Sequence, residues 1–71
     1  MGERMKFKVG DRIETTADSE NEGMFFKKGA KGIIVEIDDE TVLVKFDSGE
    51  YDKDHAEWFV NYKDMKKLKE R

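Results

Sequence analysis

The sequence has no cysteine and no proline, a single histidine and no long apolar run among its 71 residues. Without cysteine, neither a disulfide nor thiolate-bound zinc can reinforce the fold, and the absence is compatible with a reducing compartment. No apolar stretch approaches the roughly 20 residues that a bilayer-spanning helix needs. The first ten residues, MGERMKFKVG, lack the continuous apolar core of a secretory signal. These absences predict a cytoplasmic protein that does not contact a membrane.

The composition is 37% hydrophobic and 44% charged, which is typical of a soluble protein. We predict a single domain over residues 1–71, with a barrel at about 5–60 and a basic helical tail at about 61–71. A chain this short buries only roughly 60% of the surface that its unfolded form exposes, so its stability should be marginal. The net charge of −3 is unevenly spread, because residues 14–26 carry four acids and no base. Such alternation is typical of a well-solvated surface, and its functional alternative is a local basic face on an acidic protein.

A β-hairpin between Lys27 and Tyr51 organises the predicted fold. Residues 32–37, GIIVEI, are rich in β-branched side chains, which pack well on a pleated surface. They show no clean period of two, so either both faces are covered or a bulge shifts the register. Residues 41–46, TVLVKF, alternate and place Val42, Val44 and Phe46 on one face. The acidic residues 38–40 supply the first turn, and residues 47–49 supply the second.

The segments before this hairpin predict two strand pieces and a loop. Residues 5–9 alternate apolar and basic, residues 12–16 resume an extended pattern, and a polar loop follows from Ala17 to Gly23. Met24, Phe25 and Phe26 then interrupt the polarity. We predict that this apolar triplet plugs the core under the loop, because large exposed apolar clusters are uncommon on soluble monomers. The alternative is that it forms a ligand surface.

The segments after the hairpin predict short helices and a closing strand. Asp54 and Glu57 match a helix-capping box, so a single helical turn should precede the last strand at residues 58–60. Asn61 is positioned to cap a final helix over residues 62–71, whose apolar stripe of Tyr62, Met65 and Leu68 is narrow. The predicted core consists of Val9, Ile13, Ile34, Val44, Phe46 and Phe59.

The motifs do not support an enzyme. Gly29, Lys31 and Gly32 resemble a phosphate-binding loop, but that loop needs its lysine followed by Ser or Thr and then by a helix. Here Lys31 is followed by glycine and a predicted strand. His55 lies near three acids, yet no serine or cysteine motif accompanies it, so we expect neither catalysis nor a metal or other cofactor.

The order of elements resembles an SH3-like small β-barrel. The residues that carry the resemblance lie between about 7 and 60, in the segments VGDRI (9–13), KGAKGII (28–34), VLVKFD (42–47) with Gly49, and WFV (58–60). The glycine-containing start of the hairpin is also similar to the KOW motif of ribosomal proteins and transcription elongation factors. The resemblance implies an all-β, five-stranded barrel with a short C-terminal helix. The acidic balance departs from nucleic-acid-binding KOW domains, and the chain lacks the proline-binding SH3 signature.

Such barrels bind RNA, DNA, peptides or enzyme subunits, so the fold alone leaves the function open. We expect a monomeric, non-catalytic interaction module or accessory subunit that binds a protein partner through aromatic residues, which contribute strongly at interfaces. The candidate aromatic residues are Phe25, Tyr51 and Trp58. The alternative is nucleic-acid binding, in which Lys27, Lys28 and Lys31 would contact phosphates. A third idea is that the acidic rows mimic nucleic acid toward a DNA-binding enzyme.

Overall fold

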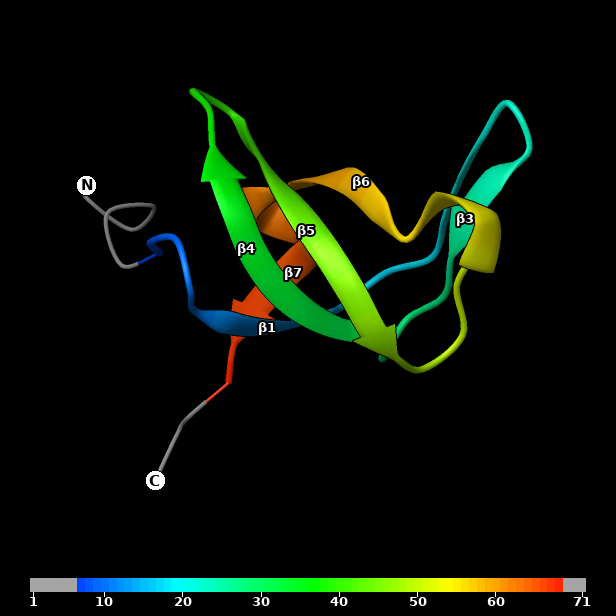
Figure 1. Ribbon diagram of the computed structural model, residues 1–71, viewed down its shortest axis with the longest axis horizontal. Helices are drawn as coiled ribbons and strands as arrows, with labels where there is room; N and C mark the ends of the chain where they lie inside the picture. The colour runs from blue at the N-terminus through cyan, green and yellow to red at the C-terminus, as the bar shows by residue number, and fades with distance from the viewer. Residues whose placement is uncertain (1–6, 69–71) are drawn as a thin grey trace.

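The computed structural model describes residues 7–68, and its longest strands form the predicted hairpin. Strand β4 spans Lys31–Ile37 and strand β5 spans Thr41–Ser48 (Figure 1). The acidic turn closes between them, because the Asp38 N–H donates to the Thr41 carbonyl at 2.9 Å. The Asp38 side chain also accepts from the Asp39 N–H at 2.9 Å, a local bond that short acidic side chains make readily.

Irregular pairing explains why the apolar run of β4 has no period of two. Ile34 lies opposite Val44, but the next pair joins Glu36 to Leu43, so Val35 is an extra residue in β4. A second register shift falls between Lys31 and Gly32. Of the two alternatives that the sequence leaves open, the bulge is therefore confirmed.

Five strands form one antiparallel sheet in the order β6-β5-β4-β1-β7. Strand β1 spans Arg12–Thr15, β6 spans Glu57–Asn61 and β7 spans Met65–Lys67. The sheet is so strongly twisted that β1 and β7 cross behind β4 and β5 in Figure 1. The all-β prediction is confirmed. Among residues 7–68 no strand pairing joins β6 to β7, so the sheet is not closed.

The long first connection contains a hairpin of its own. Strand β2 spans Ser19–Asn21 and pairs with β3, Met24–Phe26. Met24 and Phe26 are buried, which confirms the predicted core plug, and Phe25 between them is half-buried. The predicted polar loop, Ala17 to Gly23, therefore contains strand β2 and the turn that joins it to β3.

The core is formed by buried side chains of the five-stranded sheet and of the β2–β3 hairpin. Four predicted members, Ile13, Ile34, Val44 and Phe46, are at most 3% exposed. The assignment of the other two to the core is wrong, since Val9 is 61% exposed and Phe59 is 52% exposed. Successive residues of a strand face opposite sides, and in β6 the inward position belongs to Val60. Val9 lies in the turn that precedes β1. The rest of the core consists of Met24, Phe26, Ala30, Val42, Val60 and Met65.

The predicted C-terminal helix is wrong over its described part. A 3-10 helix, η3, covers only Tyr62–Asp64, and β7 follows at once. The free edge of β1 offers β7 backbone partners: the Thr16 N–H donates to the Asp64 carbonyl at 2.8 Å, and the Leu68 N–H donates to the Arg12 carbonyl at 2.9 Å. The narrow apolar stripe of the predicted helix would stabilise this segment less than its backbone pairing with β1 does. Residues 69–71 of the predicted helix lie outside the described part.

Two further boundaries differ from the predictions. The helical turn before β6 is the 3-10 helix η2, Lys53–His55, and Asp52 rather than Asp54 caps it. Strand β1 starts at Arg12, whereas residues 7–9 of the predicted strand 5–9 are not strand and residues 5–6 lie outside the described part. No helix within residues 7–68 has the length and apolar character to cross a membrane.

Candidate interaction surface

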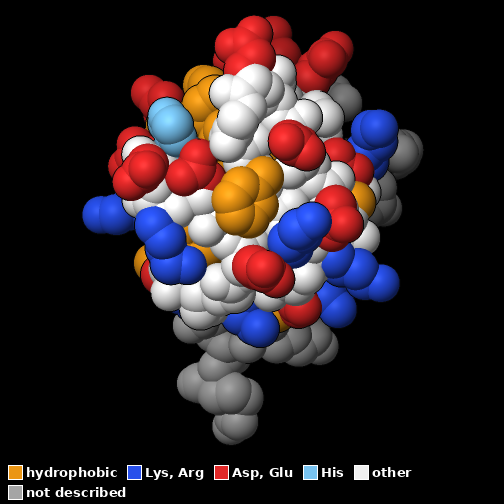
Figure 2. Space-filling view, turned by 90° about the vertical axis from the view of Figure 1, so that its right-hand side faces the viewer, with side chains coloured by type: hydrophobic (Ala, Val, Ile, Leu, Met, Phe, Trp, Pro, Cys, Tyr) orange, Lys and Arg blue, Asp and Glu red, His pale blue; other side chains and the backbone are white. Residues whose placement is uncertain are grey.

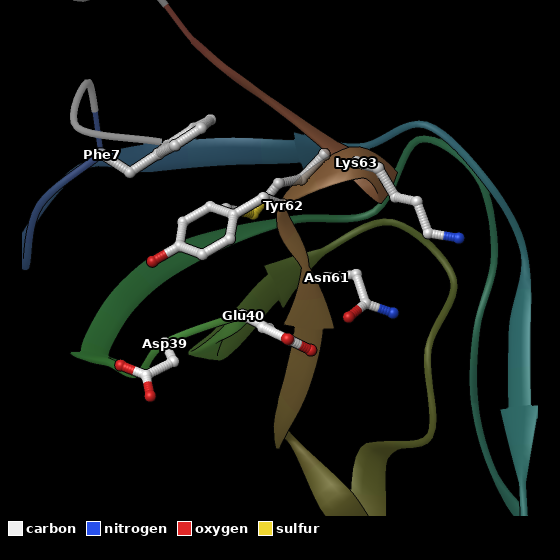
Figure 3. Close-up of a pocket in the computed structure, with 7 residues that line it drawn as sticks. Phe7, Asp39, Glu40, Asn61, Tyr62 and Lys63 are labelled. Carbon is white, nitrogen blue, oxygen red and sulfur yellow. The ribbon is translucent and has the colours of Figure 1, made fainter. Parts of the chain in front are cut away.

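A hollow of the described structure lies beside the acidic turn between β4 and β5. Its volume is about 570 Å³, and we call it the Tyr62 groove (Figure 3). It is lined by Phe7, Asp39, Glu40, Asn61, Tyr62, Lys63 and Met65. These residues come from the chain before β1, the acidic turn, the end of β6, η3 and the start of β7. Most of the lining surface is apolar.

Two aromatic rings form one side of the Tyr62 groove. The ring centroids of Phe7 and Tyr62 lie 5.7 Å apart at an interplanar angle of 40°, a favourable tilted geometry. The Tyr62 hydroxyl donates to the Asp38 carbonyl at 3.1 Å, which ties η3 to the acidic turn. Tyr62 is therefore held by its ring contact with Phe7 and by the hydrogen bond of its hydroxyl, so this wall of the groove is preformed.

Carboxylates form the opposite side of the Tyr62 groove. Asp39 and Glu40 are exposed, and Figure 3 shows them across the groove from the two rings. Lys63 and Asn61 extend toward the far end. The groove therefore combines apolar area with a local negative charge.

A second, smaller hollow of about 220 Å³ lies on the outer face of the sheet. It is lined by Glu36, Ile37, Asp38, Leu43 and Phe59. Phe59 lies directly opposite Leu43 in the pairing of β5 with β6, and 43% of Ile37 is exposed. The acidic turn thus separates two partly apolar hollows.

The backbone from Phe25 to Lys27 lies beside the backbone from Glu50 to Asp52. The Asp52 N–H donates to the Phe25 carbonyl, and the Lys27 N–H donates to the Glu50 carbonyl, both at 2.9 Å. The Tyr51 ring, however, stacks on Phe46 at 5.4 Å and carries the Lys53 ammonium 4.1 Å above its centroid. Contacts within the chain therefore occupy much of this ring.

Trp58 is half-buried and packs against the core rather than standing free at the rim. Its ring contacts His55 edge-on at 6.1 Å and Phe59 at 6.3 Å. The exposed aromatic residue of β6 is Phe59, which the sequence analysis assigned to the core. Reading the strand with Val60 inward would have placed Phe59 outward, but the roles of Phe7 and Tyr62 have no local signal.

The three candidate lysines do not form one uncompensated patch. Lys27 and Lys28 are exposed, and the Lys28 backbone N–H donates to the Asp18 carboxylate at 2.7 Å. Lys31 lies opposite Glu14 in the pairing of β1 with β4. Elsewhere on the sheet Arg12 pairs with Asp47 at 2.7 Å, Lys67 with Asp11 at 3.5 Å and Lys66 with Glu14 at 3.9 Å. On the face that carries the single histidine, acids predominate in the upper part of Figure 2, and acids and bases are mixed over the lower part.

His55, which is exposed, and Asp52, which is half-buried, form a pair at η2. The His55 ring donates from Nδ1 to the Asp52 carboxylate at 2.8 Å, and this bond is the largest cause that lowers the pKa of Asp52. The Asp54 N–H, which donates to the same carboxylate at 3.0 Å, and the charge of His55 act in the same direction, and partial burial opposes them. The pair caps the turn. Within residues 7–68 no three His, Asp or Glu side chains are grouped so as to hold a metal ion.

Comparison with protein families, with characterised proteins and with solved structures found no match to this chain.

Proposed function

We propose that this chain is a monomeric, non-catalytic interaction module that binds a partner polypeptide in the Tyr62 groove. The observation that carries the proposal is the groove itself, in which a preformed aromatic wall faces two exposed carboxylates. A few residues dominate the binding energy at interfaces and are enriched in Trp, Tyr and Arg, and a few polar groups set orientation. The carboxylates favour a cationic polypeptide and oppose a polyanion.

The strand order supports membership of the SH3-like class of small barrels. The resemblance rests on a long connection after the first strand, a central hairpin and a single helical turn before the closing strand. Here β2 and β3 occupy the long connection, η2 leads into β6, and a further strand, β7, pairs with β1. We propose an open barrel of this class, since β6 and β7 are not paired within the described residues.

Nucleic-acid binding is the second candidate function, because Lys27 and Lys28 are adjacent and exposed. Two carboxylates weaken it, because Asp18 contacts the Lys28 backbone and Glu14 lies opposite Lys31, and their negative charge lowers the local positive potential.

An affinity capture from a lysate of the source organism tests the proposed function. The bait is the full chain, compared with Glu40→Lys in the groove and with Glu20→Lys, an equivalent charge reversal at an exposed position of β2. We expect the same protein partner with the wild type and the Glu20 variant, and its loss with the Glu40 variant. A partner that the Glu40 variant retains, or one that nuclease treatment releases, would contradict binding of protein in the groove.

A further inference from the structure

The smaller hollow, on the outer face of the sheet, combines exposed apolar side chains with carboxylates. It is lined by Glu36, Ile37, Asp38, Leu43 and Phe59. Ile37 is 43% exposed and Phe59 is 52% exposed, so the apolar part of the lining is open to a ligand. The volume of about 220 Å³ is smaller than the roughly 300–1,000 Å³ of pockets that hold drug-sized ligands, and it suits a single side chain.

Three of these residues form one row across three neighbouring strands. Phe59 of β6 lies opposite Leu43 of β5, and Leu43 lies opposite Glu36 of β4. Neighbouring strands are about 4.8 Å apart, so the row extends over about 10 Å from Phe59 to Glu36. It is apolar at the edge of the sheet and anionic two strands further in. The hollow therefore has an apolar end and an anionic end.

The bulge in β4 places a carboxylate at the end of this row. In a regular ladder that continues from the pair of Ile34 with Val44, the residue opposite Leu43 would be Val35. The extra residue shifts the pairing by one, so Glu36 takes that position instead. The irregular pairing thus converts a row of three apolar residues into one that ends in an acid.

The two carboxylates of the hollow are uncompensated within the part of the chain that the structure describes. Neither Glu36 nor Asp38 forms an ion pair with any residue between 7 and 68. One Asp38 oxygen accepts the Asp39 N–H at 2.9 Å, which leaves the negative charge in place. By contrast, Glu14 and Asp47 of the same sheet each pair with a cation. The anionic end of the hollow therefore lacks a counter-charge from the described residues.

These two ends restrict the chemical class of the ligand. The carboxylates repel an anion. A purely apolar group would remove the carboxylates from water without supplying a partner, and an unpaired buried charge is costly. A cation on an apolar stem satisfies both ends, because its stem covers apolar side chains while its charged head pairs with the acids.

We infer that this hollow binds an arginine side chain of a partner, whose stem lies over Phe59 and Leu43. Its guanidinium pairs with the carboxylates of Glu36 and Asp38. Arginine fits better than lysine, because its planar head carries five donors, can bridge two carboxylates and is more weakly hydrated than an ammonium. The backbone that carries the arginine lies beside β6, since the opposite orientation places the charge on Phe59. This site is separate from the Tyr62 groove, so the inference goes beyond the proposed function.

Three peptides that differ in one side chain test the inference with isotope-labelled full-length protein. Each is an acetylated and amidated pentapeptide with two glycines on either side of arginine, lysine or citrulline, which has nearly the shape of arginine without its charge. We expect the arginine peptide to bind in the millimolar range and to shift the amide signals of Leu43 and Phe59. The citrulline peptide should bind at least about tenfold more weakly. A lysine peptide that binds as tightly as the arginine peptide would overturn the assignment to arginine.

Two pairs of protein variants provide matched comparisons. Glu36→Gln should weaken binding of the arginine peptide by about tenfold, whereas Glu57→Gln, which removes the same charge from the same face of the sheet, should change it by less than about twofold. Phe59→Ser should weaken binding by about fivefold, whereas Val9→Ser, at a similarly exposed apolar position, should not. All four are surface positions, so circular dichroism should show an unchanged fold. Equal effects within either pair would overturn the inference.

The remaining outcomes separate the inference from the proposed function. Shifts confined to Phe7, Tyr62 and Lys63 would place the arginine in the Tyr62 groove, which would overturn this inference and leave the proposed function intact. Failure of the arginine peptide to shift any of these signals would also overturn the inference, while the capture experiment would still decide the proposed function.

Discussion

Phe46 is the central aromatic residue of the core. Its ring lies 5.3 Å from Phe26 and 5.4 Å from Tyr51, and only 3% of the residue is exposed. Phe46→Ala should therefore lower the free energy of unfolding by about 3 to 5 kcal/mol, which is a large part of the stability of so small a domain. Urea denaturation followed by circular dichroism measures the change.

The control for this substitution is Phe59→Ala. Phe59 belongs to the same sheet but is 52% exposed, so its loss should change the free energy of unfolding by less than about 1 kcal/mol. Equal destabilisation by the two variants would contradict the assignment of Phe46 to the core and of Phe59 to the surface.

Gly32 is required by close approach rather than by backbone angle. A Cβ atom at this position would lie 2.5 Å from the Lys45 carbonyl oxygen and 2.7 Å from Val44 Cγ1. Gly32→Ala should destabilise the fold by about 2 to 3 kcal/mol. Gly29 is the matched control, because its φ of +94° is strained for alanine but a Cβ there meets nothing closer than 3.8 Å, so Gly29→Ala should cost about 1 kcal/mol. Thermal unfolding of both variants measures the difference, and the reverse order would contradict the prediction.

Asp52 gives the fold a dependence on acid. Its folded pKa lies below the ordinary value, chiefly because His55 donates to its carboxylate. A lowered pKa contributes stability above the unfolded pKa of about 3.9, and that stability is lost as the pH falls through the folded pKa. The stability difference between wild type and Asp52→Asn should therefore shrink as the pH falls from about 5 to about 2. Urea denaturation at several pH values measures it, and a constant difference would contradict the assigned cause.

At the scale of elements, the β2–β3 hairpin and the β4–β5 hairpin differ in their support. The first has three paired positions, and its described links to the rest of the structure are the isolated bridge from Phe26 to Tyr51, the backbone bond from Asp52 to Phe25 and the packing of two buried side chains. The second is flanked by β1 and β6 on its two sides. Local opening requires less free energy where fewer contacts must break.

Amide exchange should report this difference between the hairpins. We expect residues 20–23, at the tip of the first hairpin, to exchange at least about a hundredfold faster than Ile34 and Val44. Met24 and Phe26 should exchange more slowly than the tip, because their side chains are buried. Slow exchange throughout residues 20–23 would show that another surface covers the tip.

At the scale of the whole molecule, charge decides between the two candidate functions. The chain carries a net charge of −3, and several of its basic side chains pair with acids on the sheet. We expect short DNA and RNA oligonucleotides, single- and double-stranded, to bind no tighter than the ~10⁻⁴ M of weak non-specific contact at physiological salt. Fluorescence titration of labelled oligonucleotides measures the affinity.

The opposite outcome has its own signature. Micromolar binding that falls steeply with salt, with chemical shifts between Lys27 and Gly32, would favour nucleic-acid binding over a protein partner. Replacing Lys27, Lys28 and Lys31 together should then reduce both the affinity and the salt dependence. If the triple replacement left the affinity unchanged, nucleic-acid binding would have to be assigned to another surface.

The sequence alone determined the features that depend on neighbouring residues. Alternation in residues 41–46 placed Val42, Val44 and Phe46 inward, and the acidic residues 38–40 marked the turn, because side-chain direction and turn geometry are local properties of the backbone.

Tertiary structure decided the features that depend on partners distant in the chain. Residues 65–67 became β7 instead of helix because the edge of β1 satisfies their backbone, and no pattern within 62–71 reveals that edge. Phe59 faces outward instead of into the core, and Val60 faces inward, because the pairing with β5 sets the register. The Tyr62 groove was not foreseeable for the same reason: Phe7, Asp39 and Tyr62 are widely separated in sequence, and only the packing of η3 against the acidic turn brings them together.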